Sequence, residues 1–255
     1  MSVDAEPQGE LVLRGRIRTA SNQTYLAGIG DVPVVYKPVE GERPLWDFPD
    51  GTLAGREVAA YLVSTSFGWD VVPQTWLRDG PLGPGMVQLW KEPDPEQSAV
   101  DLVASESVPS AGWCAIVDGL DESERPVTLI HEDSAALRRM AIFDVVVNNA
   151  DRKGAHVLEM SGGHRHGVDH GLTFHVEHKL RTVLWGWVGV PLNDTELEGI
   201  DRVRADLDGV LGLALGALID PLEIASLAAR CDRLRSRAVF PAPHGEMPSL
   251  PWPLF

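Results

Sequence analysis

The sequence is poor in positive charge. Its 255 residues carry 22 lysines and arginines against 37 aspartates and glutamates, so the formal net charge is −15. Nucleic acids and anionic membranes are bound by clustered basic side chains that displace counterions. The charge balance therefore predicts no nucleic-acid partner and no stable membrane association.

Long apolar runs and closely spaced cysteines are also lacking. No stretch approaches the ~20 consecutive apolar residues that a membrane-spanning helix needs. The two cysteines, Cys114 and Cys231, lie far apart in the sequence, which is typical of reduced thiols rather than of a disulfide framework. The first ten residues, MSVDAEPQGE, are polar and acidic and do not read as a secretion signal. Together these features predict a cytoplasmic protein.

What is present is an ordinary globular composition, 44% hydrophobic and 23% charged, whose patterning changes along the chain. Residues 11–92 contain about five strand-like segments and one helical segment, 52–68, for which Gly68 is a plausible C-cap. Residues 93–132 show little pattern, and we expect loop and short helix there. The predicted divisions are a disordered tail, a β-rich lobe, a mostly helical lobe and a Pro-rich tail, at residues 1–10, 11–92, 93–240 and 241–255.

The second lobe contains three clear helical patterns and one hairpin pattern. Residues 133–149 predict a helix with Asp133 or Ser134 at its N-cap. Further helices are expected around 194–216 and 220–238.

Lysine is rare enough to be informative where it occurs. Only four lysines stand beside 18 arginines, and one of them, Lys37, ends the strand-like segment VPVVYK. A lysine among valines either reaches solvent from an edge strand or meets an anion, and its compact charge suits a phosphate. Glu57 lies among small and apolar residues of the helical segment that follows. It either faces solvent or needs a partner, for which Lys37 is a candidate.

The stretch FDVVVNNADRKGAHVLEM, residues 143–160, places a charged turn between two apolar runs. Arg152 and Lys153 flank Asp151, and their charges favour its ionised form. A carboxylate held there is suited to accept a hydroxyl proton or to orient a nucleophile. We therefore place Asp151 and Lys153 in a candidate catalytic set. The alternative is a loop aspartate that only satisfies backbone amides.

A hairpin pattern follows this turn. If SGG at 161–163 is its turn, antiparallel pairing roughly aligns His156 with Asp169, and both lie near Asp151. Two carboxylates and an imidazole at one place indicate a cation site.

A competing interpretation comes from the density of histidine, because six of the chain's eight histidines fall within 23 residues. Such density is compatible with a zinc or iron site. The HExxH spacing is absent, however, and alternation along a hairpin sends neighbouring residues to opposite faces, with His164 and His166 expected to point to solvent. The six are His156, His164, His166, His170, His175 and His178.

Phosphate-binding loops of the glycine-rich kinds are also absent, because neither a Walker A pattern nor GxGxxG occurs. The segment SNQTY, residues 21–25, lies between two strand-like segments where a phosphate-covering turn would lie. Backbone amides of a Ser21-Asn22 turn can still bind phosphate.

Taken in order, these parts resemble the protein-kinase-like fold. A strand lysine, a helix glutamate 20 residues later, GMVQLW, NNADRKGAH and VDHG follow one another. The order is similar to the phosphatidylinositol 3-/4-kinase-related, HipA-like branch, and most of all to an actinobacterial family of uncharacterised phosphatidylinositol 3-/4-kinase-like proteins. The resemblance covers roughly residues 11–190. It implies an α+β, bilobal fold with a small β-rich N-lobe and a mostly helical C-lobe that carries a catalytic β-hairpin.

The resemblance also implies that ATP is bound between the lobes. Lys37 would contact the α- and β-phosphates and would be held by Glu57. The residues implied to line the adenine are Gln88, Leu89 and Trp90.

For the reaction centre, the resemblance implies that Asp151 orients or deprotonates the acceptor hydroxyl and that Asp169 binds a metal bridging the phosphates. His156 stands where the family has a second metal-binding asparagine. The cofactors implied are ATP and Mg²⁺ or Mn²⁺. Because Mg²⁺ prefers oxygen ligands, the histidine implies a preference for Mn²⁺, a phosphate contact by His156, a site with one metal, or a weak or inactive kinase.

The sequence thus predicts an ATP-dependent phosphotransferase that moves the γ-phosphoryl group to a hydroxyl of a protein or small polar molecule. Two alternatives stay open on the same fold: a nucleotide-binding pseudokinase acting by protein interaction, and a nucleotidyl transferase (AMPylation). A metal hydrolase built on the histidines is a third alternative.

Overall fold

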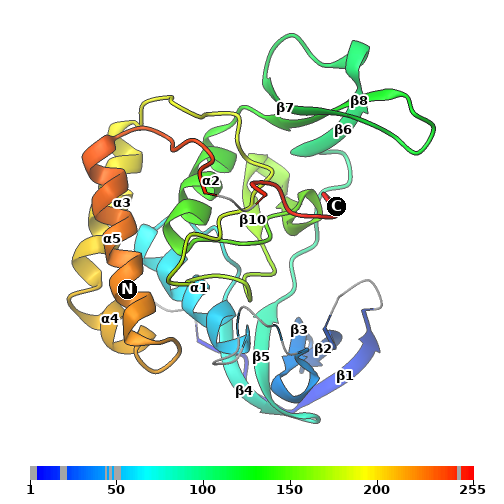
Figure 1. Cartoon of the computed structure of the whole chain (residues 1–255). Coiled ribbons are helices and arrows are strands. Elements are labelled where there is room, and N and C mark those ends of the chain that lie inside the picture. Colours follow the sequence, from blue (N-terminus) through cyan, green and yellow to red (C-terminus); the bar gives the residue numbers. More distant parts are fainter. Residues whose placement is uncertain (1–4, 18–21, 44, 46–47, 49–52, 246–247) are drawn as a thin grey trace.

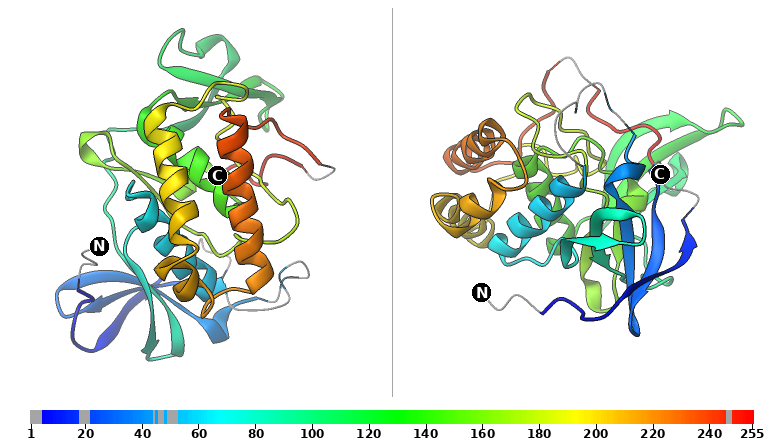
Figure 2. Two further views of the ribbon diagram at one scale, coloured as in Figure 1. Left: turned by 90° about the vertical axis from the view of Figure 1, so that its left-hand side faces the viewer. Right: turned by 90° about the horizontal axis from the view of Figure 1, so that it is seen from below.

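The computed structural model of the chain describes residues 5–17, 22–43, 45, 48, 53–245 and 248–255. Two antiparallel sheets lie at opposite ends of the molecule, and the helices lie between them and along one side (Figure 1). The long helices near the C-terminus run side by side (Figure 2). The expected α+β class and the division into a β-rich lobe and a helical lobe are confirmed.

The first sheet contains the strands of the β-rich lobe in the order β1-β2-β3-β5-β4. Its strands are β1 (Leu11–Arg16), β2 (Tyr25–Ile29), β3 (Val32–Pro38), β4 (Thr75–Gly80) and β5 (Gly83–Leu89). Along β3, Val34 and Tyr36 are buried in the core of one sheet face, so alternation turns Lys37 to the other face. There Lys37 pairs with Met86 of β5, which packs against helix α1.

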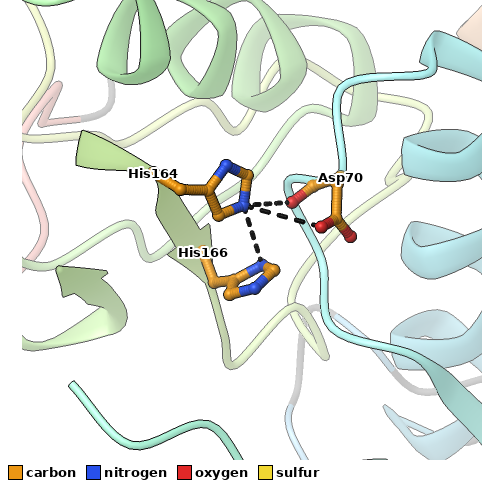
Figure 3. Close-up of side chains that lie close together, drawn as sticks. All are labelled: Asp70, His164 and His166. Carbon is orange, nitrogen blue, oxygen red and sulfur yellow. Dashed lines mark hydrogen bonds and ion pairs between the residues drawn. The ribbon is translucent and has the colours of Figure 1, made fainter. Parts of the chain in front are cut away.

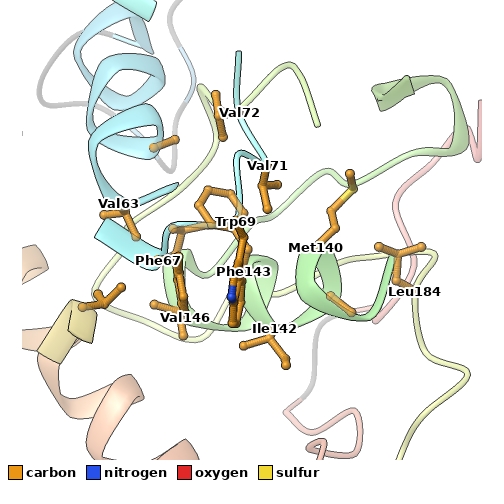
Figure 4. Packing of buried hydrophobic residues seen from close by; sticks show 14 of the residues in the cluster. Val63, Phe67, Trp69, Val71, Val72, Met140, Ile142, Phe143, Val146 and Leu184 are labelled. Atoms are coloured by element: carbon orange, nitrogen blue, oxygen red, sulfur yellow. The ribbon is translucent and has the colours of Figure 1, made fainter. Parts of the chain in front are cut away.

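Helix α1 (Leu53–Phe67) is buried on almost every side, because it packs against the first sheet and against the other helices. It ends before Gly68, whose φ of +71° is the left-handed cap conformation that glycine adopts without penalty. Phe67 stacks on Trp69 at 4.2 Å between ring centroids and meets Phe143 edge-on (Figure 4). The central position of α1 leaves its Glu57 only 3% exposed.

Residues 93–132 differ from the expectation of loop and short helix. They form a three-stranded antiparallel sheet, β6 (Val100–Ala104), β7 (Trp113–Leu120) and β8 (Pro126–Glu132), in the order β6-β8-β7. The one helical segment within residues 93–132 is a single-turn 3-10 helix, Ser105–Ser107. Much of β6 and β7 is exposed, so these strands lack the alternation that a buried face imposes.

The helical lobe begins with α2 (Ala135–Val147), whose N-cap is Ser134: its side chain accepts a hydrogen bond from the backbone N–H of Leu137. The hairpin that follows pairs β9 (Val157–Glu159) with β10 (Arg165–Gly167). The expected helix at 194–216 is two helices, α3 (Asp194–Asp206) and α4 (Val210–Leu215), because the chain turns at Asp208-Gly209. The last helix is α5 (Pro221–Arg237).

The C-terminal residues 248–255 lie against the turn that follows α2. The backbone N–H of Gly154 donates to the carbonyl of Leu254 at 2.8 Å, and the indole of Trp185 donates to the carbonyl of Ser249 at 3.0 Å. Gly154 has no side chain where the Phe255 ring passes, and a Cβ there would lie 2.2 Å from that ring. Among the helices of the described ranges, none has the length and apolar character to cross a membrane.

Candidate active site

A lysine and two carboxylates from three different elements meet between the lobes. The Nζ of Lys37 lies 2.7 Å from Oε1 of Glu57 and also contacts Oδ1 of Asp169. The expected pairing of Lys37 with Glu57 is therefore present. The second oxygen of Glu57 accepts a hydrogen bond from the backbone N–H of His170 at 2.8 Å. Glu57 thus joins β3 of the first lobe to the segment that follows the hairpin of the second.

The opposite charges of Lys37, Glu57 and Asp169 stabilise one another's ionised forms. Burial by itself lowers the pKa of Lys37, but the nearby charges of Asp169 and Glu57 outweigh burial and raise that pKa. Burial likewise works to raise the pKa of Asp169, yet Lys37 and then His156 lower it well below its usual value. The lysine and the aspartate are both ionised at neutral pH. The backbone of Asp169 has a φ of +59°, a conformation that aspartate tolerates better than most residues.

Asp151 lies on the polar turn after α2. The side-chain oxygen of Asn149 accepts a hydrogen bond from the Asp151 backbone N–H at 3.0 Å, which fixes the turn. Oδ2 of Asp151 lies 3.3 Å from Nζ of Lys153. Burial raises the pKa of Asp151, and Lys153 only partly opposes this. The predicted effect of Lys153 on Asp151 is therefore present, but burial outweighs it and the net shift of the pKa is upward.

The other flanking residue, Arg152, turns its side chain into the interior. It is fully buried, and its guanidinium donates to the carboxylate of Asp144 on α2, with Nη2 at 2.9 Å from Oδ1. Nη1 donates to the carbonyls of His156 and Val168, at 3.1 and 3.2 Å. One arginine thus ties the polar turn to the residue before β9 and to the residue after β10, and no local sequence signal marked this role.

His156 lies beside Asp169, close to the alignment expected from the SGG turn. The observed register pairs Val157 with Gly167, and Nε2 of His156 lies 3.5 Å from Oδ2 of Asp169. Burial lowers the pKa of His156 to about 4, so the ring is neutral at pH 7. Its Nδ1–H donates to the carbonyl of Asp151 at 2.8 Å, which leaves the lone pair of Nε2 directed to the carboxylate side.

These side chains open onto one cavity of about 290 Å³. The predicted site residues that line it are Asn22, Lys37, Glu57, Asp151, Lys153, His156 and Asp169. Glu42 and Arg43 also line it and were not predicted. The carboxylate of Glu42 accepts hydrogen bonds from the first amides of α1, those of Leu53 and Ala54, at 2.9 and 2.8 Å. This cap comes from a loop 11 residues earlier, a separation at which no sequence pattern indicates it.

The three residues predicted to line the adenine are not among the described residues that line this cavity. The side chain of Gln88 is buried and donates to the hydroxyl of Thr75 at 2.9 Å. The backbone N–H groups of Leu89 and Trp90 donate to carbonyl oxygens within the β-rich lobe. Ser21, predicted to contact phosphate with Asn22, lies outside the described residues.

The histidines do not gather around one centre. His156 lies at the cavity, whereas His164 and His166 lie near Asp70 in the connection between α1 and β4 (Figure 3). Nε2 of His164 donates to the Asp70 carbonyl at 2.9 Å and lies 3.4 Å from Nδ1 of His166. His166 is only 3% exposed, so the expectation that it points to solvent is wrong. Asp70, His164 and His166 are not among the described residues that line the cavity around Lys37 and Asp169.

No protein-family model matches the chain. The chain is 49% identical over 260 residues to Protein Rv2133c of Mycobacterium tuberculosis, an alignment that covers 97% of this chain and 93% of that protein. The crystal structure of a Helicobacter pylori proinflammatory kinase, CtkA, aligns with 91% of this chain and 93% of its own, at a TM-score of 0.46 and 10% identity. A TM-score below 0.5 supports no conclusion about function, so the side chains of the cavity around Lys37 and Asp169 are the basis of the functional proposal.

Proposed function

We propose that this chain, which belongs to the family of the Mycobacterium tuberculosis protein Rv2133c, is an ATP-dependent phosphotransferase with a kinase-like site. The observation that carries the proposal is the group of Lys37, Glu57 and Asp169, which opens with Asp151 onto one cavity. Phosphoryl transfer asks a protein chiefly for positioning and for neutralisation of phosphate charge. A strand lysine held by a buried glutamate supplies a fixed positive charge, and the aspartates supply metal and hydroxyl contacts.

In this proposal Lys37 binds the α- and β-phosphates of ATP. Its 2.7 Å pairing with Glu57 holds the ammonium in place, and Glu57 is itself held by the His170 amide. An ammonium group that is positioned before the ligand arrives loses little entropy on binding. Asn22 and Lys153, which line the same cavity, would contact phosphate oxygens.

Asp151 acts on the acceptor. The acceptor oxygen attacks the γ-phosphorus, the bond from that phosphorus to the bridging oxygen of ADP breaks, and the hydroxyl proton passes to the Asp151 carboxylate. A pKa raised by burial makes Asp151 a better proton acceptor than an exposed aspartate. The buried Arg152 positions this turn through its bonds to the hairpin carbonyls.

A divalent cation fits beside Asp169 and His156. Their facing atoms, a carboxylate oxygen and the unprotonated Nε2 of a neutral imidazole, lie 3.5 Å apart, and both are atoms of kinds that would hold a divalent metal ion. Oxygen ligands alone would favour Mg²⁺, whereas an imidazole is better accepted by Mn²⁺. Such an ion would neutralise phosphate charge.

The net charge of the chain favours, as the phosphate acceptor, a hydroxyl group of a protein or of a small polar molecule over a membrane lipid. A net charge of −15 opposes an anionic membrane surface, so a lipid acceptor of the phosphatidylinositol 3-/4-kinase kind has the weakest support. A nucleotide-binding pseudokinase is the second candidate. It is favoured by the histidine at the second metal position and by the direct contact of Lys37 with Asp169, which an incoming metal must replace.

The test is mass spectrometry of the nucleotide products and of the intact protein after incubation with ATP and Mg²⁺ or Mn²⁺. We expect ADP from the natural chain, with turnover reduced about 10²- to 10⁴-fold in Asp151→Asn and abolished in Asp169→Asn. Asp101→Asn, an exposed change on β6, serves as the matched control. AMP attached to protein would instead indicate nucleotidyl transfer, and ATP binding without turnover would indicate the pseudokinase.

Nucleotide binding is tested separately with Lys37→Met and the control Lys91→Met. Loss of a charge-assisted contact predicts an affinity for ATP about 10- to 100-fold weaker in Lys37→Met, with a folded protein by circular dichroism. Unchanged affinity in a folded Lys37→Met protein would contradict the phosphate role of this residue.

A further inference from the structure

The second lobe contains a larger cavity that the proposed phosphotransfer does not use. Its volume is about 490 Å³, within the size range of small-molecule sites. One wall is a face of α5, a second is the end of α2, and two irregular segments, 176–180 and 239–244, complete it. Its described lining residues are all different from those of the cavity around Lys37 and Asp169.

The ionisable side chains along the described lining of this cavity are all basic, in a chain whose net charge is −15. Arg230, Arg233 and Arg237 recur at helical spacing and share one face of α5. By contrast, Arg235 of the same helix, which does not line the cavity, pairs with Asp201 at 2.9 Å. Among the described residues no carboxylate forms an ion pair with the three arginines of the cavity face, whereas Arg235 is paired.

The lack of a paired carboxylate matters most at Arg230, because this arginine is only 9% exposed. Its Nε donates to the carbonyl of Val146 at 2.7 Å and its Nη1 to the carbonyl of His175 at 3.3 Å. Its Nη2 is buried and has no hydrogen-bond partner within the described residues, and no carboxylate among them pairs with it. Burial lowers the pKa of Arg230 to about 10. A buried guanidinium with a spare donor is costly unless an anion approaches it.

The rest of the lining adds apolar surface and two rings. His178 and His244 stack at 3.7 Å between ring centroids, so they join the two irregular segments across the cavity edge. The apolar side chains come from every wall of the cavity: Val145, Val176, Leu180, Leu234 and Val239. A ligand that fits must therefore present an acidic group to the arginines and an apolar body to these walls.

We propose that this cavity binds a small amphipathic anion, a carboxylate or phosphate carried on an apolar body. Arg230 is its inner contact, through Nη2, the guanidinium nitrogen that donates to no described group. Arg233 and Arg237 are exposed and attract the anion at the entrance. The site is independent of the proposed phosphotransfer, because it shares no lining residue with that cavity among the described ones.

The experiment uses isothermal titration calorimetry of the whole chain with four probes: decanoate, decyl phosphate, inorganic phosphate and the uncharged 1-decanol. We expect one molecule of decanoate or decyl phosphate to bind per chain. Inorganic phosphate should bind more weakly because it lacks the apolar body, and decanol should bind at least 10-fold more weakly than the better anion. The better of the two amphipathic anions identifies the acidic group.

The variant Arg230→Gln should weaken binding of that anion at least 10-fold, whereas Arg235→Gln on the other face of α5 should leave it unchanged. If Arg230→Gln does not fold, the exposed pair Arg233→Gln with Arg237→Gln is used, with an expected loss of at least threefold. Decanol binding as tightly as the anions, equal binding by the cavity variants and the natural chain, or no anion binding at millimolar concentration would overturn the proposal.

Discussion

Replacing the buried Arg152 with methionine tests how the proposed active site is held together. Arg152 and its partner Asp144 both have side chains that are 0% exposed. The substitution removes the guanidinium and leaves the Asp144 carboxylate, within the described part of the chain, with the uncharged donors of Asn149 and Thr182, at 2.9 and 3.3 Å. Removing one member of a buried pair costs about 3–5 kcal/mol, because a charge is left unpaired in the interior.

That cost is a large part of the stability of the protein, since domains unfold with about 5–15 kcal/mol in total. For a chain of this size each 1 kcal/mol lowers the Tm by about 2–4 °C, so we expect Arg152→Met to lower it by about 6–20 °C. The matched surface variant Arg235→Met breaks a pair in which both side chains are 51% exposed. Exposed pairs of this kind contribute about 0–1 kcal/mol.

Urea unfolding followed by circular dichroism measures both variants, together with the double variant Arg152→Met, Asp144→Leu. We expect the double variant to recover much of the loss, because an apolar pair of similar volume leaves no buried charge. A cost for Arg152→Met no larger than that of Arg235→Met would refute the reasoning. The same conclusion would follow if the double variant were less stable than Arg152→Met alone.

Three further predictions concern other parts of the chain. Burial lowers the pKa of His131 and keeps it neutral, with Nε2 accepting from the Gly186 amide at 3.0 Å. Below pH ~6.5 the unfolded chain therefore binds more protons than the folded chain, and the free energy of unfolding should fall as the pH falls. Urea unfolding at several pH values should show a smaller fall in His131→Gln than in the natural chain. Gly154→Ala should cost about 1–3 kcal/mol through its clash with Phe255, and almost nothing in a Phe255→Ala background. Ser134→Ala should cost about 1 kcal/mol by the same measurement, through loss of the α2 cap.

The parts of the fold and of the site that sequence could predict are those in which local rules and burial agree. The apolar segment 32–38 predicted β3, and the SGG turn predicted a pairing close to the one that brings His156 to Asp169. Both follow from a two-residue period that a buried sheet face enforces. The resemblance to kinase-like proteins supplied the roles, which remain predictions.

The features that the sequence did not predict depend on the direction of a side chain or on a partner that is distant in the sequence. Arg152 and Asp151 are neighbours, yet their side chains diverge, and only the packed α2 reveals Asp144 as the partner of Arg152. The sheet β6-β8-β7 was missed because much of it is exposed, so its hydrophobic residues keep no strict period. The adenine contact of Gln88, Leu89 and Trp90 stays a prediction, because other described residues line the cavity around Lys37 and Asp169.

The contact between Lys37 and Asp169 also has a consequence for the order of folding. These residues are 132 positions apart, so their contact closes one of the longest loops in the chain. The chain loses the conformational entropy of closing that loop before the contact can stabilise it. The hairpin and α2, by contrast, form from neighbours. In refolding from urea, helical circular dichroism should therefore return before ATP affinity does. A half-folded chain would contain the polar turn and the hairpin, but it would lack the lysine that completes the proposed phosphate site.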